Sequence, residues 1–125
     1  VGLTPYAIVT PGGNTPLVID WRGLVTSIVA AVRGAVPAAD IAAGFHAATV
    51  SMIVDTCTLL RGHGAGNVVG LTGGVFQNAL LVERSLDALH AAGFEVLTHH
   101  AVPPNDGGLA LGQVVLGRAL LAHAG

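Results

Sequence analysis

A short apolar segment that breaks at a pair of glycines constrains the fold of this chain more than any other feature. Residues 68–71 are apolar and rich in β-branched types, and the pair Gly73-Gly74 follows almost at once. From Ala79 onward, apolar residues recur with helical spacing, so this order predicts a strand, a tight turn and a helix. Glycines in such a turn can expose backbone N–H groups at the positive end of a helix, where a phosphate or carboxylate oxygen is stabilised. A sharp turn needs glycine in any case, so these residues leave ligand binding and a purely structural turn both open.

The composition suits one domain or a fragment of one. The chain has 125 residues, of which 52% are hydrophobic, and this is enough apolar material for a buried core. The first residue is Val1 and the opening segment carries no charge, so we expect a piece of a longer protein without a signal peptide. Arg, Asp, His or Gly interrupts every long apolar run, so we expect no membrane-spanning segment.

Charge and cysteine content exclude several classes of function. Lysine is absent, and five arginines stand against seven carboxylates, for a net charge of -2. A basic patch cannot form, so we expect no nucleic-acid partner bound by charge. Cys57 is the only cysteine, which excludes a disulfide framework and a cysteine zinc site within the chain. A buried, inert thiol is favoured over a nucleophile, and the cysteine content fits a reducing cytoplasm.

The first third of the chain predicts a hairpin and a helix. Extended segments at residues 6–9 and 17–19 flank a run of turn-forming residues, which favours an antiparallel pair. Asp20 can cap a helix that runs through about Arg33, and Gly34 can supply a left-handed exit.

The rest of the chain predicts helices that alternate with strands. Pro37 can be the first residue of a long helix to Leu60, which is so apolar on every side that we expect it to be buried on most sides. After the central strand, turn and helix, Gly93 is the expected C-cap, residues 94–98 predict a second core strand, and a last apolar helix follows residue 108. The predicted order is ββ-α-α-β-α-β-α.

Two loops become candidates for a site because of this order. Strands that alternate with helices favour a parallel sheet, and ligands bind at the carboxyl ends of its strands. The loops at residues 72–78 and 103–108 both leave strands at that end. In the second loop, Asp106 sits at a helix start beside two glycines and could face a ligand or a cation. Aspartate at a helix start is also a common cap, so both interpretations remain open.

Histidine and serine indicate no further catalytic arrangement. His99 and His100 are adjacent and would point to opposite faces of a strand, and the other histidines lack a partner four residues away. The sequence therefore has no zinc signature. His46 is expected to be a hydrogen-bonded core histidine, and no Ser/His/Asp nucleophile pattern is present.

Three stretches carry a resemblance to a known family. Residues 71–78 are LTGGVFQN, residues 93–96 are GFEV, and residues 103–113 are PPNDGGLALGQ. Together they resemble the C-terminal end of HypF, the family of hydrogenase maturation carbamoyltransferases. IDWR at residues 19–22 and AGFH at residues 43–46 resemble the preceding part of the same region. The resemblance therefore covers nearly the whole chain.

The resemblance implies a fold and a domain assignment. The fold would be α/β, a partial lobe of the actin/hexokinase/Hsp70-like (ribonuclease H-like) nucleotide-binding fold, with a mixed sheet and flanking helices. Residues 1–125 would be a single domain or fragment, the C-terminal lobe of a carbamoyltransferase nucleotide-binding domain. The same fold is implied for the related tRNA threonylcarbamoyl transferases.

The resemblance also implies a reaction and its residues. In the intact family members, carbamoyl phosphate and ATP yield a carbamoyl-adenylate, and the carbamoyl group passes to the C-terminal cysteine of a HypE-type partner in the cytoplasm. The family's glycine segment lies against the nucleotide, which assigns nucleotide binding to Gly73, Gly74 and Asn78. The aspartate that matches Asp106 helps to hold a divalent metal. The family's paired metal-binding histidines would lie upstream, so no catalytic residue is assigned within this chain and we expect the chain alone to be inactive.

Alternative functions remain at this point. The chain could be the lobe of a small-molecule O-carbamoyltransferase, although Phe76 and Gln77 resemble the hydrogenase-maturation branch more closely. It could also be a non-catalytic module for nucleotide binding or partner docking. In a third interpretation, the glycine turn and Asp106 are folding devices only.

Overall fold

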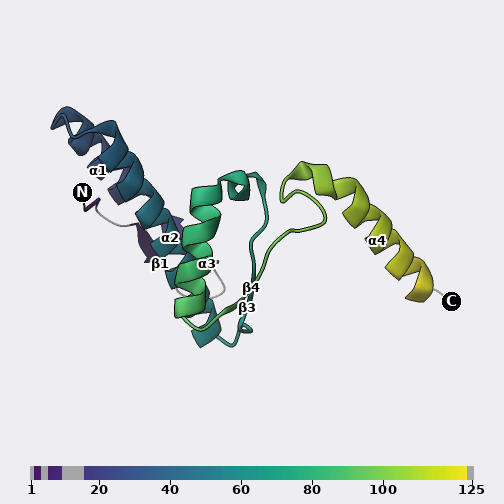
Figure 1. Ribbon diagram of the computed structural model, residues 1–125. Coiled ribbons are helices and arrows are strands. Elements are labelled where there is room, and N and C mark those ends of the chain that lie inside the picture. The colour runs from purple at the N-terminus through teal and green to yellow at the C-terminus, as the bar shows by residue number, and fades with distance from the viewer. Residues whose placement is uncertain (1, 4–5, 10–15, 124–125) are drawn as a thin grey trace. The chain divides into compact units, whose positions relative to one another are not determined.

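The computed structural model describes residues 2–3, 6–9 and 16–123 and divides into two compact units, Val1–Ala65 and Gly66–Gly125 (Figure 1). Its elements follow the order strand, strand, helix, helix, strand, helix, strand, helix, with two short 3-10 helices in the second unit. This order confirms the predicted one, and the α/β class is confirmed with it. Within the described residues, the strands form two sheets of two strands each.

The first unit opens with the predicted hairpin. Strand β1 (Ala7–Val9) pairs antiparallel with β2 (Val18–Asp20), and Ile8 lies opposite Ile19. Most of the predicted turn, residues 10–15, lies outside the described residues. Tyr6, just before β1, donates a hydrogen bond of 2.5 Å from its hydroxyl to Oδ2 of Asp55 and thereby ties the hairpin to the second helix.

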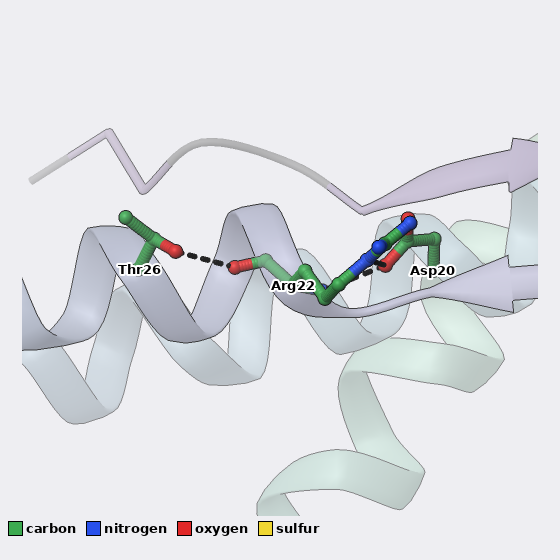
Figure 2. Close-up of polar contacts among 3 residues, drawn as sticks. All are labelled: Asp20, Arg22 and Thr26. Atoms are coloured by element: carbon green, nitrogen blue, oxygen red, sulfur yellow. Dashed lines mark hydrogen bonds and ion pairs between the residues drawn. The ribbon is translucent and has the colours of Figure 1, made fainter.

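Helix α1 (Arg22–Arg33) is preceded by an ion pair between Asp20 and Arg22 and has no side-chain cap. Trp21 occupies the N-cap position and makes no side-chain capping bond, so the prediction that Asp20 is the cap was wrong by one residue. Asp20 nevertheless accepts the backbone N–H of Arg22 at 3.0 Å, and its carboxylate also pairs with the Arg22 guanidinium at 2.5 Å (Figure 2). The Thr26 hydroxyl donates to the Arg22 carbonyl at 2.8 Å.

The end of α1 corrects a second prediction. Gly34 has φ -80°, which is not left-handed, and the next residue, Ala35, has φ 53°. The N–H groups of Ala35 and Val36 donate to the carbonyls of Val32 and Ala31. This is the bonding pattern of a Schellman motif, in which the left-handed residue follows the C-cap. Gly34 is the C-cap itself, so the left-handed position falls on an alanine.

Helix α2 (Ala38–Gly62) has the predicted extent but not the predicted burial. Pro37 is its N-cap rather than its first helical residue. Val50 is its only buried residue within the described chain, and Phe45 and Leu60 are about 40% exposed. In its own unit α2 packs against one helix, α1, which covers a single side. The prediction that α2 is buried on most sides was therefore wrong, because an apolar helix is buried only where another element covers it.

Helix α2 is also the one described helix that is long and apolar enough to cross a membrane, with a mean hydropathy of 1.3 over its best window. Length and composition alone satisfy this criterion, and core helices of soluble proteins satisfy it too. A single such helix is weak evidence for a membrane span.

The second unit contains the central strand and the predicted parallel pair. Strand β3 (Val68–Gly70) runs parallel to β4 (Glu95–Leu97), with Val69 opposite Val96. Helix α3 (Ala79–Ala91) packs against β4. Its buried residues face a small core that it shares with neighbouring segments; the buried side chains of this unit are Leu71, Leu81, Ser85, Leu89 and Phe94.

The connection from α3 to β4 follows the prediction. Gly93 has φ 80°, and the N–H of Phe94 donates to the Leu89 carbonyl at 3.0 Å. After β4, a loop leads to the 3-10 helix η2 (Asp106–Gly108) and to helix α4 (Leu109–His123). Helix α4 contacts η2, and none of its residues is buried.

Candidate functional site

The glycine turn after β3 occupies the predicted residues 72–78 but contains an element that the sequence does not predict. A 3-10 helix, η1 (Gly74–Gln77), lies between the glycine pair and α3. Asn78 then caps α3, because its Oδ1 accepts the N–H of Leu81 at 3.2 Å. Helix α3 therefore begins at Ala79 as predicted, but the expectation that the glycine N–H groups lie at its positive end was wrong. The positive end of α3 lies at Asn78, and the glycines form a separate turn before it.

The two candidate loops meet, as their positions after parallel strands predict. The Gly73 N–H donates to the Pro104 carbonyl at 2.7 Å. Beside this bond, His99 Nε2 lies 3.0 Å from the Thr72 hydroxyl oxygen. One hydrogen bond between backbone groups and one between side chains therefore link residues 72–78 to residues 99–108. The loops form one surface at the carboxyl edge of the β3–β4 pair.

The backbone of the glycine turn offers a limited set of donors. Gly73 has φ 105° and ψ 158°, a conformation that side chains strongly disfavour, so glycine is required there. Its N–H is already used by Pro104 and cannot also bind an anion. The N–H groups of Gly74 and Val75, at the start of η1, have no acceptor in the described part of the chain. These two groups are the donors that a ligand oxygen could reach.

In the second loop, Asn105 rather than Asp106 caps the 3-10 helix η2. Oδ1 of Asn105 accepts the N–H of Gly107 at 3.0 Å, so Asn105 caps η2. Asp106 is exposed, and its carboxylate makes no hydrogen bond or ion pair with any described residue. A side chain at Gly107 would begin 3.0 Å from both Asn105 Oδ1 and Pro103 Cγ. The glycine after Asp106 is thus explained by close packing, and the cap interpretation of Asp106 is not supported.

An open cleft of about 750 Å³ connects the two loops with helix α4. Gly73 and Asp106 both line it, together with His99. Its other wall is apolar and consists of residues from α4, among them Leu109, Val115, Leu116 and Ala119. Gly74 and Asn78 do not line the cleft. The cleft therefore joins two of the four residues predicted from the sequence.

The sequence matches a known family over most of its length. Residues 4–113 match the family described as "Carbamoyltransferase, Kae1-like Domain, second subdomain". The chain belongs to the HypF carbamoyltransferase family. All four residues predicted for the site lie inside the matched HypF region.

Individual HypF proteins agree with this assignment. The chain is 34% identical over 110 residues to carbamoyltransferase HypF of Synechocystis sp.. This alignment covers 88% of this chain and 14% of the Synechocystis protein. It is 40% identical over 103 residues to HypF2 of Cupriavidus necator, with 82% of this chain and 12% of that protein covered. The chain thus spans about one seventh of the length of these HypF relatives.

A solved HypF structure has the same fold. The crystal structure of full-length HypF in the phosphate- and nucleotide-bound form matches with a TM-score of 0.87 and 33% identity. The match covers 96% of this chain and 16% of that one. The α/β architecture described above is therefore that of the corresponding part of HypF.

One residue of this chain, Asp106, is suited to bind the divalent metal that the HypF resemblance implies. An exposed carboxylate without a partner, at the edge of a cleft, is a suitable oxygen ligand for a hard divalent cation, and Asp106 meets this description. Among the described residues, no three His, Cys, Asp or Glu side chains lie close enough to hold a metal ion. Asp106 could therefore be one ligand of a set completed by groups outside this chain.

Sequence reasoning missed several residues of this surface. Thr72 and His99 lie just beyond the ends of β3 and β4, and this position is the signal that could have identified them. The predicted loop after the second core strand begins at His99, and β4 ends two residues before it, at Leu97. Outside the cleft, His46 Nδ1 donates a hydrogen bond of 2.8 Å to the Ala42 carbonyl, and its side chain is half-buried. Burial raises the pKa of the Cys57 thiol, which fits the expected inert role.

Proposed function

We propose that this chain forms part of the nucleotide site of a HypF-type carbamoyltransferase. The observation that supports this most strongly is the junction of the two loops, where the Gly73 N–H bonds to the Pro104 carbonyl and Gly73 and Asp106 border one cleft. A glycine backbone and an unpaired carboxylate at one edge of parallel strands are suited to a phosphate-bearing ligand and its cation. The nucleotide-bound HypF structure, which shares this fold, supports the same proposal.

The proposed reaction is that of the intact family. Carbamoyl phosphate and ATP would yield a carbamoyl-adenylate with release of phosphate and pyrophosphate. The carbamoyl group would then pass to the C-terminal cysteine thiol of a HypE-type acceptor protein in the cytoplasm, with AMP as the leaving group. In this proposal, Gly73 and Gly74 let the adenylate approach the backbone, and the free N–H groups of Gly74 and Val75 donate to its oxygens. A divalent cation held in part by Asp106 would stabilise negative charge on the phosphates.

Asn78 keeps its proposed role in nucleotide binding, but that role must be separated from its cap. Its side-chain oxygen accepts the Leu81 N–H, so Asn78→Ala removes both the cap and any contact with a ligand. Asn78→Ser retains an oxygen that can cap the helix and removes the amide. We expect both variants to weaken nucleotide binding, and only Asn78→Ala to lower the free energy of unfolding, by about 1 kcal/mol.

Isothermal titration of this chain with ATP or AMP, with and without Mg²⁺, tests the proposal. We expect binding that Mg²⁺ strengthens, and we expect Asp106→Asn to abolish the effect of Mg²⁺ without changing stability, because the Asp106 carboxylate makes no bond to the described residues. Asn105→Ala is the matched control, since it removes the η2 cap and should lower stability. An effect of Mg²⁺ that persists in Asp106→Asn would contradict the assignment of Asp106.

A further inference from the structure

A hydrogen bond between two side chains joins the loops of the cleft. His99 Nε2 lies 3.0 Å from Thr72 Oγ1, and the two residues are 27 positions apart in the sequence. We infer that His99 is a positioning residue, which holds Thr72 and thereby sets the glycine turn against the loop that carries Asp106. This inference rests on the proposed nucleotide site.

The geometry makes this bond one of two ties at the same place. Thr72 directly precedes Gly73, whose N–H bonds to the Pro104 carbonyl at 2.7 Å. One tie is therefore made by the side chain of Thr72 and the other by the backbone of the next residue. Both ties reach the segment that follows β4. Together they hold Gly73 against the segment 99–104.

The bond sets loop geometry more than it stabilises the fold. Thr72 and His99 are both exposed, whereas the core of the unit lies under α3 at Leu81 and Leu89. A hydrogen bond at an exposed site exchanges with water and contributes little to the free energy of unfolding. His99 also lines the cleft together with Gly73 and Asp106. A change in its bond is therefore expected to move the borders of the cleft while the core stays intact.

The chain provides a matched control for this bond. His100 Nε2 lies 3.1 Å from Thr98 Oγ1, so the same two chemical groups pair in the same loop. This second pair is only two residues apart in the sequence, does not reach the glycine turn, and is not part of the cleft lining. A variant without the Thr98 hydroxyl therefore loses the same kind of hydrogen bond but keeps the contact between the two loops.

Amide hydrogen exchange of Gly73 tests the inference without any ligand. Thr72→Val removes the hydroxyl at nearly constant volume, and His99→Leu removes its partner. We expect each to speed exchange of the Gly73 N–H by about three- to tenfold, the range that one hydrogen bond supplies. Thr72→Ser should restore slow exchange, and the double variant Thr72→Val/His99→Leu should exchange no faster than either single variant. Thr98→Val should leave Gly73 unchanged. Unchanged exchange in both Thr72→Val and His99→Leu would overturn the inference.

Titration of the same variants with ATP and Mg²⁺ then separates the inference from the proposed function. We expect Thr72→Val and His99→Leu to weaken ATP binding by roughly three- to tenfold, with recovery in Thr72→Ser and no loss in Thr98→Val. If the unaltered chain binds no ATP while Gly73 exchange responds as expected, the nucleotide role of this chain fails and the positioning role of His99 stands. If the unaltered chain binds ATP and Thr72→Val binds it equally well, His99 does not position the nucleotide loop.

Discussion

At the scale of single residues, Gly73 is the position where backbone conformation and the site coincide. Its φ of 105° and ψ of 158° belong to a region that is open almost only to glycine. Gly73→Ala should therefore lower the free energy of unfolding by about 1–3 kcal/mol, measured by urea denaturation of the whole chain. Gly74→Ala is the control, because a Cβ there would meet only Asn105 Cβ, at 4.0 Å, an ordinary contact. Equal losses in the two variants would contradict this account of the turn.

Ala35 shows the opposite case, a left-handed residue that is not glycine. Its φ of 53° places its Cβ close to the backbone, at a cost of about 1–2 kcal/mol for an L-residue. Ala35→Gly relieves this strain but increases the entropy of the unfolded chain, so we expect a net gain in stability of about 0.5–1 kcal/mol. Gly34→Ala should change stability little, since Gly34 has φ -80° and its Cβ would lie 3.4 Å from the Ala30 carbonyl oxygen. A loss of stability in Ala35→Gly would refute the Schellman assignment.

The ion pair between Asp20 and Arg22 predicts that the stability of the protein depends on pH (Figure 2). The Arg22 side chain, and after it the Arg22 backbone N–H, lower the pKa of Asp20 from 3.8 to about 2. Because the folded-state pKa lies below the ordinary value, the contribution of Asp20 to stability is complete above about pH 4 and disappears as the pH falls through 2. Carbon-detected NMR titration of the Asp20 carboxylate measures this pKa directly. Arg22→Gln should raise the pKa of Asp20, but not fully to 3.8, because the hydrogen bond from the backbone N–H of residue 22 remains. A pKa of 3.8 for Asp20 in the unaltered chain would disprove the ion pair.

At the scale of elements, sequence patterns that depend on neighbouring residues predicted the structure well. The hairpin, the β3–β4 pair, α3 and its glycine exit at Gly93 all follow from local periodicity and from turn residues. The meeting of the two loops could be predicted as well, because parallel strands end at one edge. The η1 turn could not, since a 3-10 helix of four residues has no periodicity of its own.

Burial is the property of elements that the sequence could not supply. The composition of α2 indicates an apolar helix, but which of its sides is covered depends on the elements around it, and among the described elements of its unit α1 makes the main contact with it. The same limit applies to Asp106 and Asn105, because both residue types cap helices and only the structure shows that Asn105 does so. Local preference thus identified the types of residue at the site, and the tertiary contacts decided their roles.

Helices α3 and α4 should differ sharply in their dynamics for this reason. Helix α3 buries Leu81, Ser85 and Leu89, whereas α4 buries no residue and carries many exposed apolar side chains. A helix of this length is marginal in water without packing, so α4 should open far more often. Hydrogen exchange followed by mass spectrometry should show slow exchange in α3 and rapid exchange in α4 at low protein concentration. Equal protection of the two helices in dilute solution would contradict the exposed position of α4.

At the scale of the whole molecule, the site is open and chemically incomplete. The cleft contributes a glycine backbone, one unpaired carboxylate and an apolar wall, and the described residues hold no group of three metal-binding side chains. The HypF relatives are about seven times as long as the aligned segment, since the match covers 14% of the Synechocystis protein. Such a surface is sufficient to bind a nucleotide, but transfer of a carbamoyl group needs several groups fixed around the reacting atoms.

We therefore expect this chain alone to produce no carbamoyl-phosphate-dependent consumption of ATP. The measurement is release of phosphate and pyrophosphate from ATP and carbamoyl phosphate in the presence of Mg²⁺, with full-length HypF2 of Cupriavidus necator as the positive control under the same conditions. Failure of the chain to turn over these substrates, combined with ATP binding by titration, would place it as a binding lobe whose catalytic groups lie elsewhere in a HypF-type protein. Turnover by the chain that Asp106→Asn abolishes would instead show that this surface holds a complete active site, and the requirement for further ligands would be wrong.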